Sequence, residues 1–448
     1  MNINGTALAG NLPVNFEVFK NFNDFFSIEL DFILNEQNRK DLQIDFINLK
    51  GNTKVSLAVE ENESNWLITS NIDLYDNELL IPELNFIKNK KEICEVRLET
   101  VLDKTLNFNN LVFEFKNELL NFSGNTFFNL ESNNFNIKID HFNYGENDFQ
   151  SEILIEPNNT FSVKIYGKKI FFPLFELNSE EKIMDLFLDI KIDEIIFEDK
   201  YSFYFPNIKY SRKSNGQLNI QLNAFYSDEN SLSLNIFSEA AYPNQNIKEY
   251  TFSTDNAGAF LAKFGFENLI HGGKLSLEGY TGDIDENIDI MGTVSIDDFI
   301  LKDAPIIAEL LLAASFTGLF DLLTSDGIPF EQFDAQFNGK DNKYIIKKSR
   351  AYGFSLGFTS VGWIDRSNRT MDIGGSIIPA YTINSIFNDI PIIGEIFSGR
   401  EDEGIFGVNY RSSGDWEDLD NKINPLSALT PGILRRIFDF IDRPDIQE

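Results

Sequence analysis

The feature that most constrains this fold is the alternation of apolar and polar residues through the first 250 positions. Between residues 26 and 34, for example, every second position is apolar, and Ser27, Glu29 and Asp31 lie between. Because successive side chains of a strand point to opposite faces, each such run predicts a strand with one apolar face. Turn-forming clusters such as Asn62–Asn65 separate the runs, which recur about every 10 to 20 residues. This spacing favours an antiparallel, all-β protein over a parallel α/β sheet.

The predicted apolar-face residues share one parity within each strand. They are Phe26, Ile28, Leu30, Phe32, Leu111, Phe113, Phe115, Phe135, Ile137, Phe161, Val163, Leu218, Ile220, Leu232 and Leu234. Leu42, Ile44 and Phe46 alternate in the same way and predict a further strand. One-sided strands of this kind fit either the closed core of a sandwich or a long curled antiparallel sheet whose apolar side forms a groove. Phe, of which the chain has 44, suits a groove lining because it is large, rigid and without polar atoms.

From about residue 255 the pattern changes, and helical spacing appears between strands. Apolar helices are predicted at 255–266, 305–323, 383–397 and 431–441. We therefore divide the chain into a repetitive β-groove region, 1–250, and a C-terminal region, 251–448, with short amphipathic capping helices. These helices can plug the end of a groove, contact a membrane or partner, or simply pack on the core. Their candidate contact residues are Leu310, Leu311, Ile386, Phe387, Leu434, Ile437 and Phe438.

Composition excludes several classes of function. A formal net charge of -32 disfavours nucleic-acid binding, because the chain repels phosphate backbones. One cysteine, Cys94, and two histidines leave little material for a disulfide, a metal site or a cofactor, and we expect none of these. Cys94 lies at apolar parity, so we expect a buried structural thiol. No clustered polar site is evident, and the chain is not expected to be an enzyme.

Residues 255–440 resemble the C-terminal region of AsmA-like proteins of the YhdP/TamB type, which occur in bacteria with two membranes. The stretches that carry the resemblance are Asp255–Phe260, His271–Leu275, Asp298–Pro305, Leu319–Leu323, Gly327–Phe330, Ala351–Gly353, Gly375–Ala380, Ile390–Gly394 and Asn424–Gly432. The last is the most specific, since many small and turn-forming residues fall in order there. The resemblance implies an inner-membrane anchor helix, a long periplasmic β-groove and transport of phospholipid toward the outer membrane. The sequence departs in showing no anchor helix.

Three functional hypotheses remain at this point. The first is a periplasmic lipid-transfer protein that carries phospholipid acyl chains between inner and outer membrane along the groove, with partner proteins at either membrane. The second is a scaffold or assembly factor for outer-membrane biogenesis that carries no lipid itself. The third, an enzyme acting on an extended polymer, needs a polar site that the sequence does not show.

Overall fold

A computed structural model describes residues 2–20, 26–44, 48–62, 65–103, 108–129, 134–172, 184–197, 201–238, 246–263, 269–285, 288–302, 304–313, 316–379, 408–416 and 418–424. The chain divides into two compact units, Met1–Asn215 and Gly216–Glu448. The described strands include 24 that belong to a long sheet, so the prediction of an all-β chain dominated by a long antiparallel sheet is confirmed. Because the two units are not placed relative to one another, each is described by itself.

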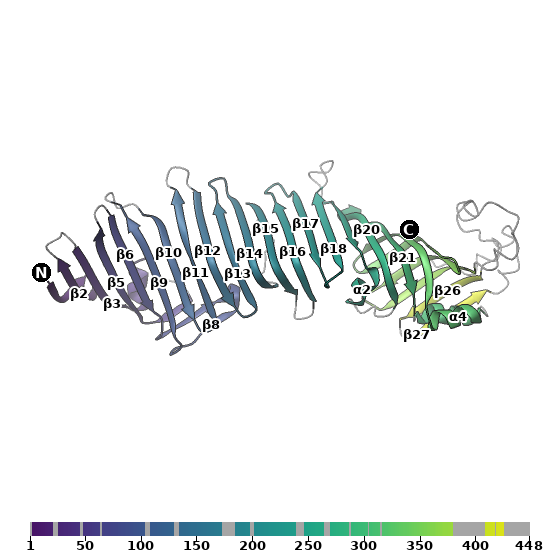
Figure 1. The fold of residues 1–448 in the computed structure, drawn as a ribbon, viewed down its shortest axis with the longest axis horizontal. Coiled ribbons are helices and arrows are strands. Elements are labelled where there is room, and N and C mark those ends of the chain that lie inside the picture. Colours follow the sequence, from purple (N-terminus) through teal and green to yellow (C-terminus); the bar gives the residue numbers. More distant parts are fainter. Residues whose placement is uncertain are drawn as a thin grey trace. The chain divides into compact units, whose positions relative to one another are not determined.

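In unit 1, thirteen strands pair in the order in which they follow along the chain (Figure 1). They are β1 (Asn2–Ala9), β2 (Leu12–Lys20), β3 (Phe26–Leu34), β5 (Thr53–Asn62), β6 (Asn65–Asp73), β9 (Cys94–Leu102), β10 (Phe108–Asn117), β11 (Leu120–Asn129), β12 (Asn134–Tyr144), β13 (Asn147–Ile155), β14 (Thr160–Phe172), β15 (Asp185–Phe197) and β16 (Tyr201–Arg212). The tight turns have the expected chemistry. Gly10 and Gly145, which open two of them, have φ of +64° and +57°, values that glycine adopts without strain.

One strand pair departs from the antiparallel pattern. β14 and β15 run parallel, with Phe161 opposite Leu186 and Ile165 opposite Ile190. A parallel pair requires the chain to return to the end of the sheet where the first strand began. The connection, residues 173–183, lies outside the described residues. The alternation in these two strands predicts which face is apolar, but it carries no information about strand direction.

β-Bulges reset the parity partway along several strands of unit 1. In β12, Ile139 pairs with Gly124 and His141 with Ser123, so Asp140 is the extra residue. In β14, Lys168 is extra in the same way, between Gly167 and Lys169. A bulge inserts one residue and re-aims those that follow. Beyond these bulges the buried side chains are Phe142 and Ile170, at even positions, whereas the inward side chains before them lie at odd positions.

A small three-stranded sheet packs on the apolar side of the unit 1 sheet. It consists of β4 (Leu49–Gly51), β7 (Asn77–Ile81) and β8 (Phe86–Lys88), with the single turn η1 (Pro82–Leu84) between the last two. Helix α1 (Glu36–Asp41) precedes it, and Asn35 caps that helix through a reciprocal hydrogen-bond pair with Asn38. The predicted strand around Leu42 is therefore wrong, because Leu42 is the C-terminal cap of α1. Phe46 lies outside the described residues.

In unit 2, eleven described strands form an antiparallel succession. They are β17 (Leu218–Phe225), β18 (Ser231–Ser238), β19 (Lys248–Thr254), β20 (Ile270–Asp285), β21 (Ile288–Leu301), β22 (Ile328–Lys340), β23 (Lys343–Tyr352), β24 (Leu356–Asp365), β25 (Thr370–Pro379), β26 (Val408–Asp415) and β27 (Asp418–Asn424). Asp341 and Asn342, with φ of +50° and +66°, form the two-residue turn between β22 and β23. Both residue types tolerate this left-handed conformation.

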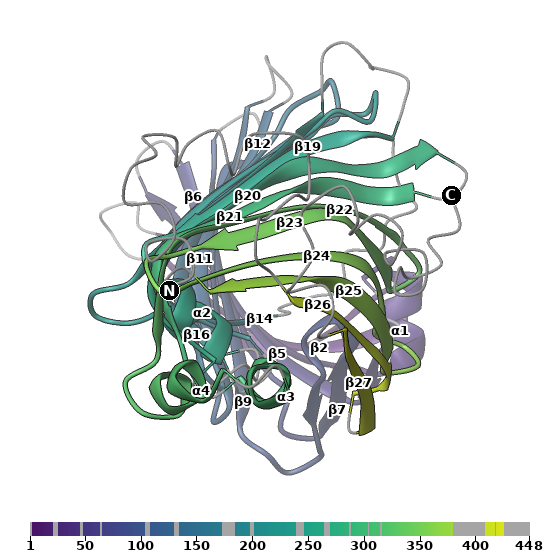
Figure 2. The same cartoon turned by 90° about the vertical axis from the view of Figure 1, so that its right-hand side faces the viewer.

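Three short helices cover one side of the unit 2 sheet, as Figure 2 shows. They are α2 (Ala257–Ala262), α3 (Pro305–Ala313) and α4 (Thr317–Thr324). The single helix predicted over 305–323 is thus two helices, because Phe316, with φ of -88° and ψ of +55°, leaves the helical region. The helices predicted at 383–397 and 431–441 lie outside the described residues. The unit boundary at residue 215 and the sequence-based division at 250 separate the chain at different places, and the latter stays a prediction.

Candidate functional site: the apolar face of the unit 1 sheet

Residues paired across unit 1 form continuous rows on one face of the sheet, which we call the apolar face. The middle row crosses twelve strands from β2 to β16. Its members are Phe16, Leu30, Leu57, Ser70, Leu98, Phe113, Gly124, Ile139, Ser151, Ile165, Ile190 and Ile208. Nine of these twelve side chains are apolar, and all nine are half-buried rather than buried. Neighbouring strands lie about 4.8 Å apart, so the row is on the order of 50 Å long.

The structure brings the predicted unit 1 residues together on this face. Ile28, Leu30 and Phe32 of β3 pair with Val18, Phe16 and Val14 of β2. Phe113 of β10 pairs with Leu98 and Gly124 of its two neighbours. The remaining predicted residues of unit 1 occupy the adjoining rows, and only Phe115 among the eleven is buried. These are Phe26, Leu111, Phe115, Phe135, Ile137, Phe161 and Val163.

The predicted residues of unit 2 lie on one face of its own sheet. Ile220 pairs with Ile236, and Leu234 with Leu222. Leu232 is buried, while Leu218, Ile220 and Leu234 are half-buried. These side chains, on β17 and β18, lie on the face of the unit 2 sheet that α2, α3 and α4 cover over its later strands.

Close packing fixes the ring of Phe113. A β-carbon added at Gly124 would lie 2.9 Å from Phe113 Cζ, so the ring lies directly over that glycine. On the other side the ring is 6.1 Å from the Phe122 ring, centroid to centroid, at a tilt of 60°. Val112, one residue earlier, points to the opposite face and is 42% exposed. Phe113 and Val112 are therefore neighbours in β10 whose side chains lie on opposite faces of the sheet.

Along one edge of the apolar face most side chains are buried in a cluster that includes residues of the small sheet. A ladder of stacked rings crosses β10 to β13. Phe115 stacks on Phe122 at 4.9 Å, and Phe142 on Phe149 at 4.6 Å, with interplanar angles of 5° and 22°. Phe86 of β8 lies edge-on to Phe115 at 6.2 Å. The alternation did not place Phe142 on this face, because it follows the bulge that resets the parity of β12. Phe149, which has the same parity as Ser151 in β13, was not among the predicted residues.

Two buried cations hold the small sheet in place. Arg39 of α1 donates to the carbonyl oxygens of Leu49 and Gly51, each at 2.8 Å. Lys88 of β8 donates through Nζ to the carbonyl oxygens of Leu74 and, at 2.7 Å, Asn77. Burial lowers the pKa of the Lys88 ammonium, since desolvation disfavours the charged form. These contacts give both cations backbone carbonyl oxygens as hydrogen-bond acceptors.

Cys94 is buried beside this cluster, as predicted, with 1% of its surface exposed. Burial raises the pKa of its thiol to about 11, and the nearby Lys88 partly offsets this. A thiol with such a pKa and no access to solvent is a poor nucleophile, so Cys94 is a packing residue.

The opposite face of unit 1 is charged and solvated. Ion pairs on it, such as Lys138–Asp140 at 2.6 Å and Lys116–Glu114 at 3.0 Å, involve side chains that are about half exposed. A shallow depression of about 450 Å³ on this face is lined by polar residues such as Asn15, Asp31 and Ser56 together with apolar ones such as Pro13 and Ile33. Within the described ranges, no group of three or more His, Cys, Asp or Glu side chains is placed to hold a metal ion.

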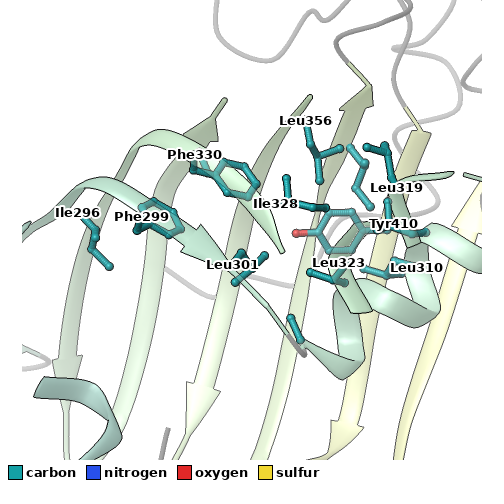
Figure 3. Packing of buried hydrophobic residues seen from close by; sticks show 14 of the residues in the cluster. Ile296, Phe299, Leu301, Leu310, Leu319, Leu323, Ile328, Phe330, Leu356 and Tyr410 are labelled. Carbon is teal, nitrogen blue, oxygen red and sulfur yellow. The ribbon is translucent and has the colours of Figure 1, made fainter. Parts of the chain in front are cut away.

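In unit 2 the corresponding apolar side chains are covered by helices. Leu310 and Leu311 of α3, both predicted contact residues, are completely buried in the core. Figure 3 shows Tyr410 of β26 among Leu310, Leu319 and Leu323, and Phe330 beside Phe299. The Tyr410 hydroxyl donates to the Thr359 carbonyl oxygen at 3.1 Å. Leu310 and Leu311 are therefore core residues. Ile386, Phe387, Leu434, Ile437 and Phe438 lie outside the described residues.

None of the helices in the described parts of the chain is long and apolar enough to span a membrane. Comparison of the chain with protein-family models, with curated proteins and with solved structures found no match.

Proposed function

We propose that unit 1 binds the acyl chains of phospholipids along its apolar face and passes them from strand to strand. The observation that carries this proposal is the middle row, whose nine apolar side chains, distributed over twelve strands, are only partly buried. A monomeric soluble protein rarely exposes a long contiguous apolar surface unless something binds there.

The chemistry of the face selects an apolar ligand. Backbone donors and acceptors of the strands are used in the sheet ladders, and the middle row offers only aliphatic and aromatic groups apart from Ser70 and Ser151. A ligand bound there gains the transfer of its own apolar surface from water, about 25 cal/mol per Å². It forms few hydrogen bonds, so its affinity varies little from one strand to the next. Movement along the face therefore needs no chemical step.

The dimensions agree with acyl chains. The row, on the order of 50 Å long, exceeds the roughly 15 Å of one leaflet's hydrocarbon, half of the bilayer core. More than one lipid therefore fits in file, with headgroups in water. The choice of phospholipid as cargo, and of the space between two bacterial membranes as the compartment, rests on the resemblance of residues 255–440 to AsmA-like proteins.

The test is the lipid content of the protein. Purified without detergent, the chain should carry phospholipid that native mass spectrometry resolves as discrete mass additions. It should also exchange a fluorescent phospholipid between vesicles. Protein that carries no lipid and leaves the vesicles unchanged would contradict the proposal and favour an assembly role without lipid carriage.

A further inference from the structure

The apolar face of unit 1 is buried at one end of its strands by a cluster that joins the long sheet to the small one. The Tyr144 hydroxyl of β12 donates to the carbonyl oxygen of Asn85, just before β8, at 3.4 Å, so the small sheet reaches as far as β12 (Figure 1). We call this cluster the floor. Its members, each 9% exposed or less, include Leu74, Cys94, Phe115, Leu120, Phe142 and Phe149 of the long sheet, with Leu49 and Phe86 of the small one.

At the opposite ends of the same strands, the apolar-face side chains form a half-buried row, which we call the rim. Trp66 pairs with Leu102 in this row, and Ile155 pairs with both Phe135 and Phe161. A Trp ring is apolar with one N–H donor, and such rings lie where an apolar phase meets water. A bound lipid therefore places its headgroup at the rim, because the floor end is closed by buried side chains.

The depth between rim and floor is close to the length of an ordinary acyl chain. On β9 the half-buried positions run from Leu102 to Val96, six residues apart, which is about 20 Å. On β12 they run from Phe135 to Ile139, four residues apart, which is about 14 Å. One leaflet of the bilayer core is about 15 Å thick. Because an extended chain advances about 1.3 Å per carbon, this depth accommodates about 11 to 15 carbons.

We propose that the floor limits the length of the acyl chains that unit 1 binds. The limit rests on the proposed function and adds an orientation to it: each chain lies along the strands, with its headgroup at the rim and its methyl end against the floor. Phe122 of β11 is placed to meet that end. It is half-buried, one row below Gly124, and stacks on Phe115 at 4.9 Å and Phe142 at 6.4 Å between ring centroids.

The floor should produce a break in the dependence of affinity on chain length. Each methylene moved from water onto the apolar face raises affinity by up to about fourfold. That gain ends at the floor, because further methylenes stay in water or displace closely packed rings. Affinity should therefore rise with chain length and then level off or fall beyond about 11 to 15 carbons.

The test is competition among lipids of graded chain length for the full, delipidated protein. Vesicles supply equal amounts of phosphatidylcholines with chains on both sides of the predicted limit, and native mass spectrometry identifies those bound. Phe122→Ala should move the break to longer chains by up to one row of the sheet, about 7 Å or five carbons. Phe127→Ala makes the same change in β11, but Phe127 lies on the opposite face and is 49% exposed, so the break should not move.

Ile139→Trp is the converse variant, and it keeps the limit testable if Phe122→Ala does not fold. Its larger ring reduces the open depth on β12 and should move the break to shorter chains. Affinity that rises through the whole series, or a break that stays in place in the folded variants, would overturn the limit and leave the proposed function intact. Protein that binds none of the phosphatidylcholines would overturn both.

Discussion

Truncation of Phe86 should detach the small sheet from the edge of the apolar face. Phe86 is 1% exposed and lies edge-on to both Phe115 and Tyr144, with ring centroids 6.2 and 5.8 Å away. Replacing a buried Phe by Ala generally costs about 3–5 kcal/mol of unfolding free energy, which includes the loss of such aromatic pairs. We expect about 4 kcal/mol for Phe86→Ala. The next residue, Ile87, is 59% exposed, so Ile87→Ala should cost about 0.5 kcal/mol or less.

The assay must report on unit 1 alone. Trp66 is the one tryptophan in residues 1–215, and replacing Trp363 and Trp416 with Phe leaves it as the sole reporter. Its ring lies edge-on to Phe26 at 6.0 Å, so unfolding should change its fluorescence. With a urea dependence of about 1–3 kcal/mol per M, the Phe86→Ala midpoint should fall by about 1 M or more. A midpoint equal to that of Ile87→Ala would refute the assigned packing of the small sheet.

Three other predictions concern single sites. Cys94, buried and with its thiol pKa raised to about 11, should resist thiol reagents at pH 8 in the native protein and react once per chain in denaturant; equal rates would contradict its burial. Burial raises the pKa of Tyr410 to about 12, against about 10 unfolded, so its contribution to stability is complete below pH 10 and lost between pH 10 and 12. Urea titrations should show that loss, and Tyr410→Phe should reduce it. Asp372 accepts two hydrogen bonds from Arg411, at 2.8 and 2.6 Å, so Asp372→Ala should cost about 2 kcal/mol in thermal unfolding; no change would mean the pair contributes nothing.

Much of the apolar face could be predicted from alternation alone. In β3 and β10 the parity of Ile28, Leu30 and Phe113 predicts the observed face, because an undisturbed strand has a side-chain period of two. The prediction fails where that period is interrupted. The extra residues Asp140 and Lys168 change which positions of β12 and β14 face inward, from odd to even. Neither Asp nor Lys is a residue type from which a bulge could be predicted.

Other features depend on contacts that a sequence pattern does not contain. Leu42 and Ile44 alternate like strand residues, yet the reciprocal cap of Asn35 and Asn38 begins a helix that ends at Leu42. The parallel pairing of β14 and β15 is equally hidden, because parity is the same for either strand direction. Whether the apolar strand faces are open or covered also could not be predicted. In unit 2 the same alternation ends in a core under α3 and α4, while in unit 1 the apolar side chains of the middle row are only partly buried.

The central claim is that lipid binds on the apolar face of unit 1, and the most direct test compares Phe113→Asp with Val112→Asp. The two residues are neighbours in β10 but point to opposite faces, so both variants add the same charge to the same strand. Phospholipid bound per chain, measured by native mass spectrometry after identical detergent-free purification, should fall several-fold in Phe113→Asp and stay at the wild-type level in Val112→Asp. The urea unfolding midpoints of the two variants would confirm that unit 1 is folded in both of them. Equal lipid content in the two folded variants would contradict the claim.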